Sequence, residues 1–267
     1  MLPDQASSVQ ASSVQASSVL ASSVLASSVQ ARTVASITLR ATIGRKRAIL
    51  FALPPLILVL VTALLKAGHA HGDWPSAILG SFGLAVVLPL TALIIGTSVL
   101  GAEIDDGSVV HLLATPVPRS TVILSKFAVA TALTMLFAAV PEFLAGLIAA
   151  GGPGRLAAGL FAGALAGSVI YNAVFVMISA LTTRAIAVGL LYLLVWESLL
   201  SNVVSGVRVL SVEQYSLGIA NSIARNGNLN AHLGVATAAV MGVLVTVVAL
   251  GLAIRRLAAF SLKGDAV

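Results

Sequence analysis

The sequence predicts an all-α membrane protein with six transmembrane helices and both termini in the cytoplasm. Its 267 residues are 58% hydrophobic and 9% charged, whereas a soluble domain carries about 25% charged residues. The chain contains several apolar runs of about 20 residues, the length that crosses a bilayer. Most lysines and arginines fall on one side of these runs. The length suits a single transmembrane domain, 48–267, in the cytoplasmic membrane.

Composition also excludes several kinds of site. The chain has no cysteine, which rules out disulfides, thiolate metal sites and cysteine nucleophiles. Its net charge of +6 would suggest nucleic acid as a partner of a soluble protein. In a membrane protein such residues anchor the topology on the cytoplasmic side. We therefore expect the lipid bilayer as a partner and no nucleic acid.

Two segments precede the first apolar run. Residues 1–31 are of low complexity and contain five copies of Ala-Ser-Ser-Val-(Gln/Leu) over 6–30. A five-residue step turns about 140° on a helix, so the valines share no face. We expect no packed structure there, with a tether as the functional alternative. Residues 32–47 alternate apolar and polar side chains over 36–43, as a strand does, and end in the basic triplet Arg45–Arg47.

The first three spans are expected at Ala48–Leu65, Ala77–Leu100 and Thr121–Ala150. Pro54-Pro55 predicts a kink in the first span, which neighbouring helices tolerate. The loop after this span holds His69, His71 and Asp73, residue types that bind metals. The adjacent Trp74 favours instead a polar outer loop at the membrane interface, so we expect no metal site.

The last three spans are expected at Leu156–Leu181, Ala185–Leu200 and Ala236–Ile254. Gly159, Gly163 and Gly167 recur every four residues and put a smooth strip on one helix face, where another helix can approach closely. Helix packing is therefore favoured over a substrate-lining role. The loop 201–230 is too polar and broken to span but keeps apolar residues. Short helices at or dipping into the outer leaflet, and a plain external loop, both stay open.

The distribution of basic residues orients the chain. With both termini inside, 11 of the 15 lysines and arginines lie on the cytoplasmic side, as the positive-inside rule requires. These are Arg32, Arg40, Arg45, Lys46, Arg47, Arg119, Lys126, Arg184, Arg255, Arg256 and Lys263. The other four, Lys66, Arg155, Arg208 and Arg225, lie outside.

The segment between the second and third spans is the long polar interruption with charges of both signs. Its acidic start is followed by Gly107, then by the apolar stretch Val109–Ala114, which can form a short helix. Pro116 ends that helix, because proline lacks an amide donor. A short apolar helix held between two spans suits docking into a groove of another protein. The predicted docking loop, 101–120, uses Glu103, Asp106, Gly107, Val110, Leu112, Leu113, Pro116 and Arg119.

This loop resembles the cytoplasmic loop of ABC-2-type permeases, the membrane subunits of ATP-binding-cassette exporters. The shared pattern is Glu103, Asp106-Gly107-Ser108, Leu112-Leu113-Ala114-Thr115-Pro116-Val117, Arg119 and Lys126. The resemblance implies a permease that exports a lipid, drug or peptide-like substrate. It implies that ATP and magnesium bind a separate ATPase subunit, and that a second permease copy or a homologous permease is a partner. It also implies an interfacial helix over 32–47.

Four polar residues within the predicted spans are candidates for a substrate path or gate. Glu142 follows Pro141, and a carboxylate there costs a few kcal/mol unless it is hydrated or paired. It either faces a cavity or lies near the outer headgroups, bonded to backbone groups freed by a helix break. Tyr171 and Asn172 either line a path or bond across helices. Glu197 raises the same question at the outer end of the fifth span.

The sequence carries no catalytic signature. It has no Walker-type phosphate-binding motif, no His-Glu-x-x-His and no Gly-x-Ser-x-Gly. We therefore expect no enzyme activity and no cofactor on this chain itself. Two alternatives to a permease remain. One is a membrane scaffold or immunity-type protein. The other is an ion-coupled secondary transporter, which needs acids deep in the spans.

Overall fold

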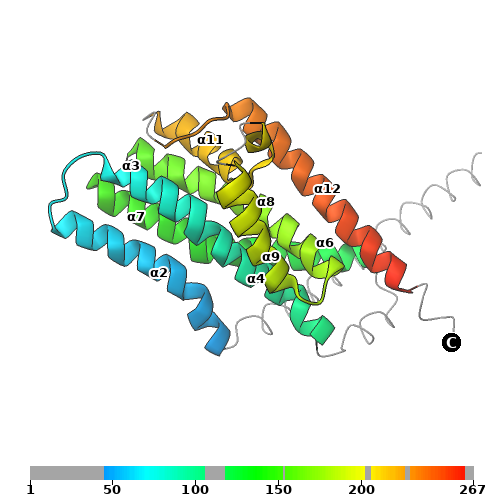
Figure 1. Cartoon of the computed structure of the whole chain (residues 1–267). Coiled ribbons are helices and arrows are strands. Elements are labelled where there is room, and N and C mark those ends of the chain that lie inside the picture. Colours follow the sequence, from blue (N-terminus) through cyan, green and yellow to red (C-terminus); the bar gives the residue numbers. More distant parts are fainter. Residues whose placement is uncertain (1–44, 106–117, 153, 202–205, 226–228, 262–267) are drawn as a thin grey trace, which may run out of the picture.

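The computed structural model describes residues 45–105, 118–152, 154–201, 206–225 and 229–261. All regular structure within these ranges is helical (Figure 1). The α-helices are α2 (Arg45–Ala67), α3 (Trp74–Ile78), α4 (Leu88–Asp105), α6 (Arg119–Thr134), α7 (Val140–Ala150), α8 (Arg155–Leu181), α9 (Ala185–Leu191), α11 (Val212–Ala224) and α12 (Val235–Ser261). The others are η1 (Leu79–Val87), η2 (Met135–Ala139), η3 (Tyr192–Leu200) and η4 (Val207–Leu210).

Five helical stretches of the described chain are long and apolar enough to cross a membrane. They are Ile49–Ala67, Trp74–Val99, Arg119–Ala150, Arg155–Leu181 and Val235–Ala258. They correspond to the predicted first, second, third, fourth and sixth spans. The predicted fifth span is a shorter apolar helix, Ala185–Leu200, made of the 7 residues of α9 and the 9 of η3. The protein is thus an all-helical, multi-pass membrane protein in which one expected span stops short.

The bundle has two ends, which serve as reference points below. The proximal end holds the carboxyl end of α4, the start of α6 and the turn at Thr182–Arg184. The distal end holds the turn at 68–73 and the turn at 151–152 that follows α7. Helix α2 begins and α12 ends at the proximal end (Figure 1). At the distal turn Gly151 adopts φ 75°, a left-handed conformation that glycine takes without a steric penalty.

Helix α8 runs through the centre of the bundle. It packs against α4, α6, α7, α9, α11 and α12. In its most apolar 18-residue stretch, 72% of the residues are buried. Its sequence explains this position, because Gly159, Gly163, Gly167, Ala164 and Ser168 are small and let neighbouring backbones approach. In α2 and α12 the buried share is only 22%. These two helices lie on the outside, where lipid tails match their side chains.

Three of the predicted spans contain a π-helical segment, namely η1, η2 and η3. π-helical turns are rare and often occur at functional sites. Gly83 lies in η1, Glu142 follows η2 by three residues and Glu197 lies within η3. Both carboxylates singled out from the sequence are therefore in or next to a segment where the regular backbone ladder is altered.

The docking loop is bounded by longer helices than predicted. Helix α4 continues through Glu103 to Asp105, because no residue before Gly107 breaks it, and α6 starts at Arg119 after Pro118. The remaining docking residues, Asp106, Gly107, Val110, Leu112, Leu113 and Pro116, lie outside the described residues. The docking helix stays a prediction. Segment 1–31 and residues 32–44 also lie outside, while the triplet Arg45–Arg47 starts α2.

Candidate functional site

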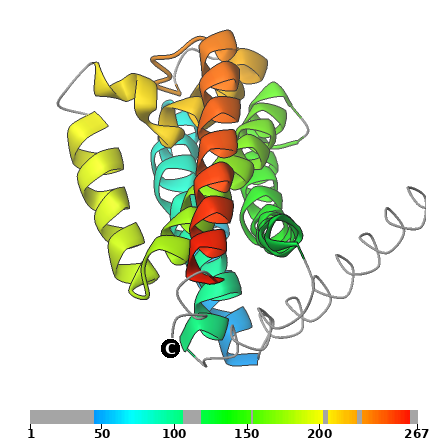
Figure 2. The same ribbon diagram turned by 90° about the vertical axis from the view of Figure 1, so that its right-hand side faces the viewer.

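The short fifth helix is followed by a break and a return into the bundle. After η3 the chain passes through η4 and begins α11 at Val212. Along α8, Gly167 lies against Ser216, Gly163 against Ala220 and Gly159 against Ala224. Since α8 starts at the distal end, this pairing shows that α11 runs antiparallel to α8, toward the distal end. Helices α9, η3 and α11 together make one interrupted crossing (Figure 2).

Glu197 holds the two halves of this crossing together. Its carboxylate oxygen Oε1 accepts hydrogen bonds from the Tyr192 hydroxyl (2.8 Å) and the Val212 amide (3.0 Å). Oε2 accepts from the Ser211 hydroxyl (2.6 Å) and the Glu213 amide (3.4 Å). Only 3% of Glu197 is exposed. A carboxylate is favourable here, because the first amides of a helix lack intrahelical partners and carry partial positive charge.

Further hydrogen bonds fix the segment around this cap. We use the term junction for residues 196–201 and 206–215, which link η3 to α11. Side chains from both halves bond to main-chain oxygens of the junction. The bonds are Arg208 Nε to Ser201 (3.0 Å), Trp196 Nε1 to Leu210 (3.3 Å) and the Tyr215 hydroxyl to Val209 (2.6 Å). The junction is thus a structured turn within the described residues.

The glycine strip of α8 is what allows α11 to lie so close. A Cβ atom on Gly163 would lie 2.5 Å from the Ser216 carbonyl oxygen, and one on Gly159 would lie 2.5 Å from the Ala220 oxygen. No real side chain fits at such distances to backbone atoms. Gly167 would meet the Ser216 hydroxyl in the same way. The three glycines therefore pack the interrupted fifth crossing against the central helix.

Tyr171 lies close to the junction. Its ring stacks on Phe175, with centroids 5.9 Å apart and planes 10° apart. Phe175 in turn meets Tyr192 edge to face at 6.3 Å, and Tyr192 bonds Glu197. Two of the four candidates, Tyr171 and Glu197, are thus linked through aromatic contacts. The Tyr171 hydroxyl is fully buried and has no hydrogen-bond partner among the described residues.

Asn172 points elsewhere and bonds across helices. Its Nδ2 donates to the Thr134 hydroxyl on α6 (2.9 Å) and to the Ser168 carbonyl oxygen (2.7 Å). Its Oδ1 lies against Gly96 of α4. Because Asn172 is fully buried, it acts as a polar contact among α4, α6 and α8. Bonding across helices is one of the two roles that the sequence left open for this residue.

Glu142 is separate from the junction. It is 2% exposed and its carboxyl group lies over Gly83 of η1, at the place where a Cβ atom would otherwise be. Its Oε1 has no hydrogen-bond partner among the described residues. Glu142 is therefore a buried group inside the packing of α7 and η1. The sequence left two positions open for Glu142, one facing a cavity and one near the outer headgroups. The choice between them depends on the rotation and depth of the helix, which packing against its neighbours sets.

The proximal end is stabilised next to the docking loop. Lys126 is fully buried, and its Nζ donates to the Val99 carbonyl oxygen (2.9 Å). This bond joins α6 to α4 on either side of the loop. The sequence marked Lys126 as a topology anchor and as part of the motif shared with ABC-2-type permeases, but its burial could not be predicted, since it depends on helix pairing. Arg119 begins α6, and Glu103 lies in the last part of α4.

Some functional residues were missed although a sequence signal existed. Ser211-Val212-Glu213-Gln214 has the Ser-x-x-Gln form of a capping box. In the structure the Gln214 amide donates to the Ser211 hydroxyl (3.3 Å), which marks the start of α11. The Gln214 side chain bonds the His232 amide instead of closing the box (3.1 Å). The partner of Ser211, Glu197, carries no local signal, because 14 residues separate them.

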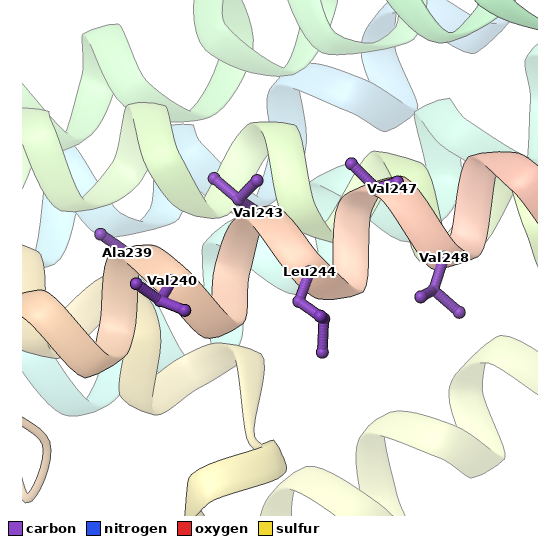
Figure 3. Close-up of a pocket in the computed structure, with 6 residues that line it drawn as sticks. All are labelled: Ala239, Val240, Val243, Leu244, Val247 and Val248. Atoms are coloured by element: carbon purple, nitrogen blue, oxygen red, sulfur yellow. The ribbon is translucent and has the colours of Figure 1, made fainter.

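The described residues gather no set of metal ligands at the four candidates. No three His, Cys, Asp or Glu side chains come together anywhere in the described ranges. An open hollow of about 530 Å³ lies instead on α12, lined by Ala239, Val240, Val243, Leu244, Val247 and Val248 (Figure 3). This surface is apolar, and none of the four candidates belongs to its lining.

These features define a helical membrane protein with an interrupted crossing and a polar junction inside the bundle. The sequence profile of the ABC-2 family transporter proteins matches residues 43–211. That segment covers more than half of the chain, from the start of α2 to the residue before α11, so the chain belongs to this family. The resemblance noted in the docking loop is thereby confirmed at the level of the family. No curated protein sequence matches the chain.

Proposed function

We propose that the chain is the permease subunit of an ABC exporter whose energy comes from a separate ATPase subunit. The family match over 43–211 carries this proposal, because proteins of this family generally work with such a subunit. On this view ATP and magnesium bind the partner, and this chain has no catalytic activity. Two copies, or one copy with a homologous permease, form the transporter in the cytoplasmic membrane, with the substrate path between them.

The proposed docking site is the loop 101–120 at the proximal end. Its two flanking helices, α4 and α6, are joined by the bond from Lys126 to Val99 (2.9 Å). A push on the loop would therefore move both helices as one body. Helix α4 packs on α8 and α9, which supports a mechanical connection from the loop to the interrupted crossing. Closure of the ATPase subunits then tilts the spans and releases the substrate outward.

The substrate class we propose is apolar or amphiphilic, such as a lipid, drug or peptide-like molecule. The surfaces of α2, α9–η3 and α12 that remain open are lined by leucine, valine and isoleucine. An apolar path favours molecules that already partition into the membrane.

The proposal is tested by purifying the protein gently from its native membrane and identifying by mass spectrometry what copurifies. We expect a stoichiometric ABC ATPase with the wild-type chain. Leu112→Asp puts a charge into the apolar docking contact. A buried unpaired charge costs about 2–5 kcal/mol, so ATPase recovery should fall by more than about tenfold.

His71→Asp is the matched control, since it adds the same charge to an exposed turn at the distal end. This variant should retain the ATPase. Full ATPase recovery and normal transport by Leu112→Asp would remove the docking loop from the mechanism. A homo-oligomer without any ATPase would overturn the permease proposal and favour the scaffold or ion-coupled alternatives.

An ion-coupled transporter is the second candidate, and one observation favours it. Glu142 and Glu197 are both buried within the membrane bundle, and acids at such positions mark ion pathways in secondary transporters. Glu197 is occupied by four donors, which leaves Glu142 as the group that such a mechanism would use. Transport that continues without ATP but requires an ion gradient would establish this alternative.

A further inference from the structure

Glu142 is a buried acid that the packing leaves without a partner at one oxygen. Only 2% of the residue is exposed, and its Oε1 has no hydrogen-bond partner in the described chain. Helix α7 continues from Glu142 for eight more residues to Ala150, which is about 12 Å or about two helical turns. The carboxyl group therefore lies inside the bundle, below the distal end.

The carboxyl group occupies a notch in η1, which continues from α3 beside α7 (Figure 1). A Cβ atom on Gly83 would lie 2.7 Å from the Glu142 Cδ atom and closer still to both carboxyl oxygens. Only glycine leaves this space free, so the backbone of η1 forms the floor of the notch. Leu79 and Leu84 of η1 and Ala145 of α7 are fully buried members of one apolar cluster. The notch thus has a backbone floor and apolar neighbours in both elements.

The elements packed on α7 and η1, which are α2, α3, α4, α8, α11 and η2, bring no positive charge to this notch. Within the described ranges their basic residues lie at helix ends, namely Arg45, Lys46, Arg47 and Lys66 of α2, Arg155 of α8 and Arg225 after α11. Lys66 bonds the Ala149 carbonyl oxygen (3.1 Å), about 10 Å beyond Glu142 along α7, and Arg155 is exposed. Their other ionisable side chains are acids or phenols, namely Glu103, Asp105, Glu213, Tyr171 and Tyr215.

Glu197 shows how this chain surrounds a carboxylate elsewhere, with two hydroxyl and two amide donors. A carboxylate can only accept hydrogen bonds, whereas a neutral carboxylic acid carries an O–H donor of its own. The amides of a helical backbone, such as the floor of the notch, are already bonded to carbonyl oxygens. A buried charge without donors or an opposite charge is so unfavourable that the group neutralises instead. The surroundings of Glu142 therefore suit the neutral form of the side chain.

We propose that Glu142 is a proton-binding site, at which the packed bundle holds the side chain as a neutral carboxylic acid in the notch at Gly83. The ligand is a single proton, bound to one carboxyl oxygen. Its release breaks that O–H bond and passes the proton to water, so release requires α7 and η1 to separate. A movement of these two elements would thus change the charge inside the bundle, as protonable acids do in membrane proton relays.

This inference goes beyond the proposed function and does not rest on it. It concerns the resting state of one side chain, whether the transporter is driven by ATP or by an ion gradient. The experiment below uses the purified full chain without an ATPase subunit. A failure of the ATPase test and a failure of the proton site are therefore distinguishable.

Infrared spectroscopy tests the proposal, because the C=O stretching band of a neutral carboxylic acid is separate from the bands of carboxylates and amides. The chain is measured at neutral pH in a maltoside detergent, which has no carbonyl group. The wild-type protein should show this band. Glu142→Gln replaces the acid by a neutral group of the same size and should lose the intensity of one carboxyl group. Glu197→Gln, at the acid with four donors, and Asp73→Asn, at an exposed acid, are the matched controls and should keep that intensity.

Isotope labelling keeps the test decisive even if Glu142→Gln does not fold. Glu142 is one of four glutamates in the chain, so ¹³C at the glutamate carboxyl carbon should shift the band of the unmutated protein. Labelled aspartate should leave the band in place. A wild-type protein without this band, or one whose band shifts only with labelled aspartate, overturns the proposal. An unchanged band in folded Glu142→Gln also overturns it, because the proton then belongs to another acid.

Discussion

At the scale of single residues, partners decide what a buried polar group does. Glu197 receives four hydrogen bonds and fastens η3 to the first turn of α11. Asn172 is a contact among three helices. Glu142 has a buried oxygen without a partner in the described chain. A glutamate therefore has a structural role at position 197, whereas at position 142 it leaves a buried oxygen without a hydrogen-bond partner in the described chain.

The cap formed by Glu197 can be tested directly. Glu197→Ala leaves Tyr192, Ser211 and two amides without their acceptor, which costs roughly 1–3 kcal/mol. The melting temperature should fall on the order of 5 °C, measured by thermal unfolding of the detergent-solubilised protein. Glu197→Gln should lose less, because the amide oxygen still accepts.

Glu213→Gln is the control for this cap. It changes the neighbouring carboxylate while it keeps the Glu213 amide that bonds Glu197. Its melting temperature should stay close to that of the wild type. An equal loss of stability in Glu197→Ala and Glu213→Gln would mean that local charge, and not the cap, stabilises α11.

At the scale of elements, α8 and α11 form the central pair of the bundle. Their contact depends on glycines at steps of four, which leave no side chain at the points where the partner backbone passes. Helix α11 has 13 residues, too few to cross a bilayer of about 30 Å. It is held in the bundle by this contact and by the cap at its start.

A single methyl group should disturb that pair. In Gly163→Ala the new Cβ meets the Ser216 oxygen at 2.5 Å and the Ala220 Cβ at 2.8 Å, so α11 must move. Overpacking of this kind costs about 1–3 kcal/mol, and thermal unfolding should show a lower midpoint. Protease sensitivity of the 201–230 segment should rise at the same time.

Gly251→Ala in α12 is the matched control for the packing test. Gly251 also lies inside a helix, but nothing approaches its Cβ position within 4 Å. Alanine has the higher helix propensity, by about 1 kcal/mol, so this variant should be as stable as the wild type or more stable. A destabilisation equal to that of Gly163→Ala would contradict the role given to the strip.

At the scale of the whole molecule, the two ends of the described chain lie at the same end of the bundle (Figure 1). Arg119, Arg184, Arg255 and Arg256 lie at this proximal end or close to it. The positive-inside rule then predicts that the proximal end is cytoplasmic. The same orientation brings the docking loop to the side where an ATPase can bind.

Reporter fusions test this orientation. We expect a fluorescent protein fused after Val267 to fluoresce, because that fusion point is cytoplasmic. We expect alkaline phosphatase inserted at Gly152 to be active, because the distal turn lies outside. A reporter that requires the external side but works at Val267 would reverse the orientation and exclude docking at 101–120.

Much of the architecture could be predicted from the sequence. The predicted spans Leu156–Leu181 and Thr121–Ala150 agree with α8 and with the continuous helix formed by α6, η2 and α7 to within a few residues. Long apolar runs are a local property, and a bilayer imposes helix on them. The interruption of the fifth crossing was not predicted, because Ala185–Leu200 is apolar over most of its length and reads as an ordinary span. Its end depends on a cap supplied from 14 residues away.

The sequence by itself determined that this protein is helical, membrane-embedded and related to ABC-2 permeases, because hydropathy, charge distribution and the loop motif are properties of short segments. Only the tertiary structure decided which faces of the helices meet. It placed Glu197 at the start of α11, Asn172 among three helices and Lys126 under the α4 carbonyl of Val99. Hydrogen bonds between distant segments depend on helix rotation and depth, and these are set by packing against neighbours that no local pattern contains.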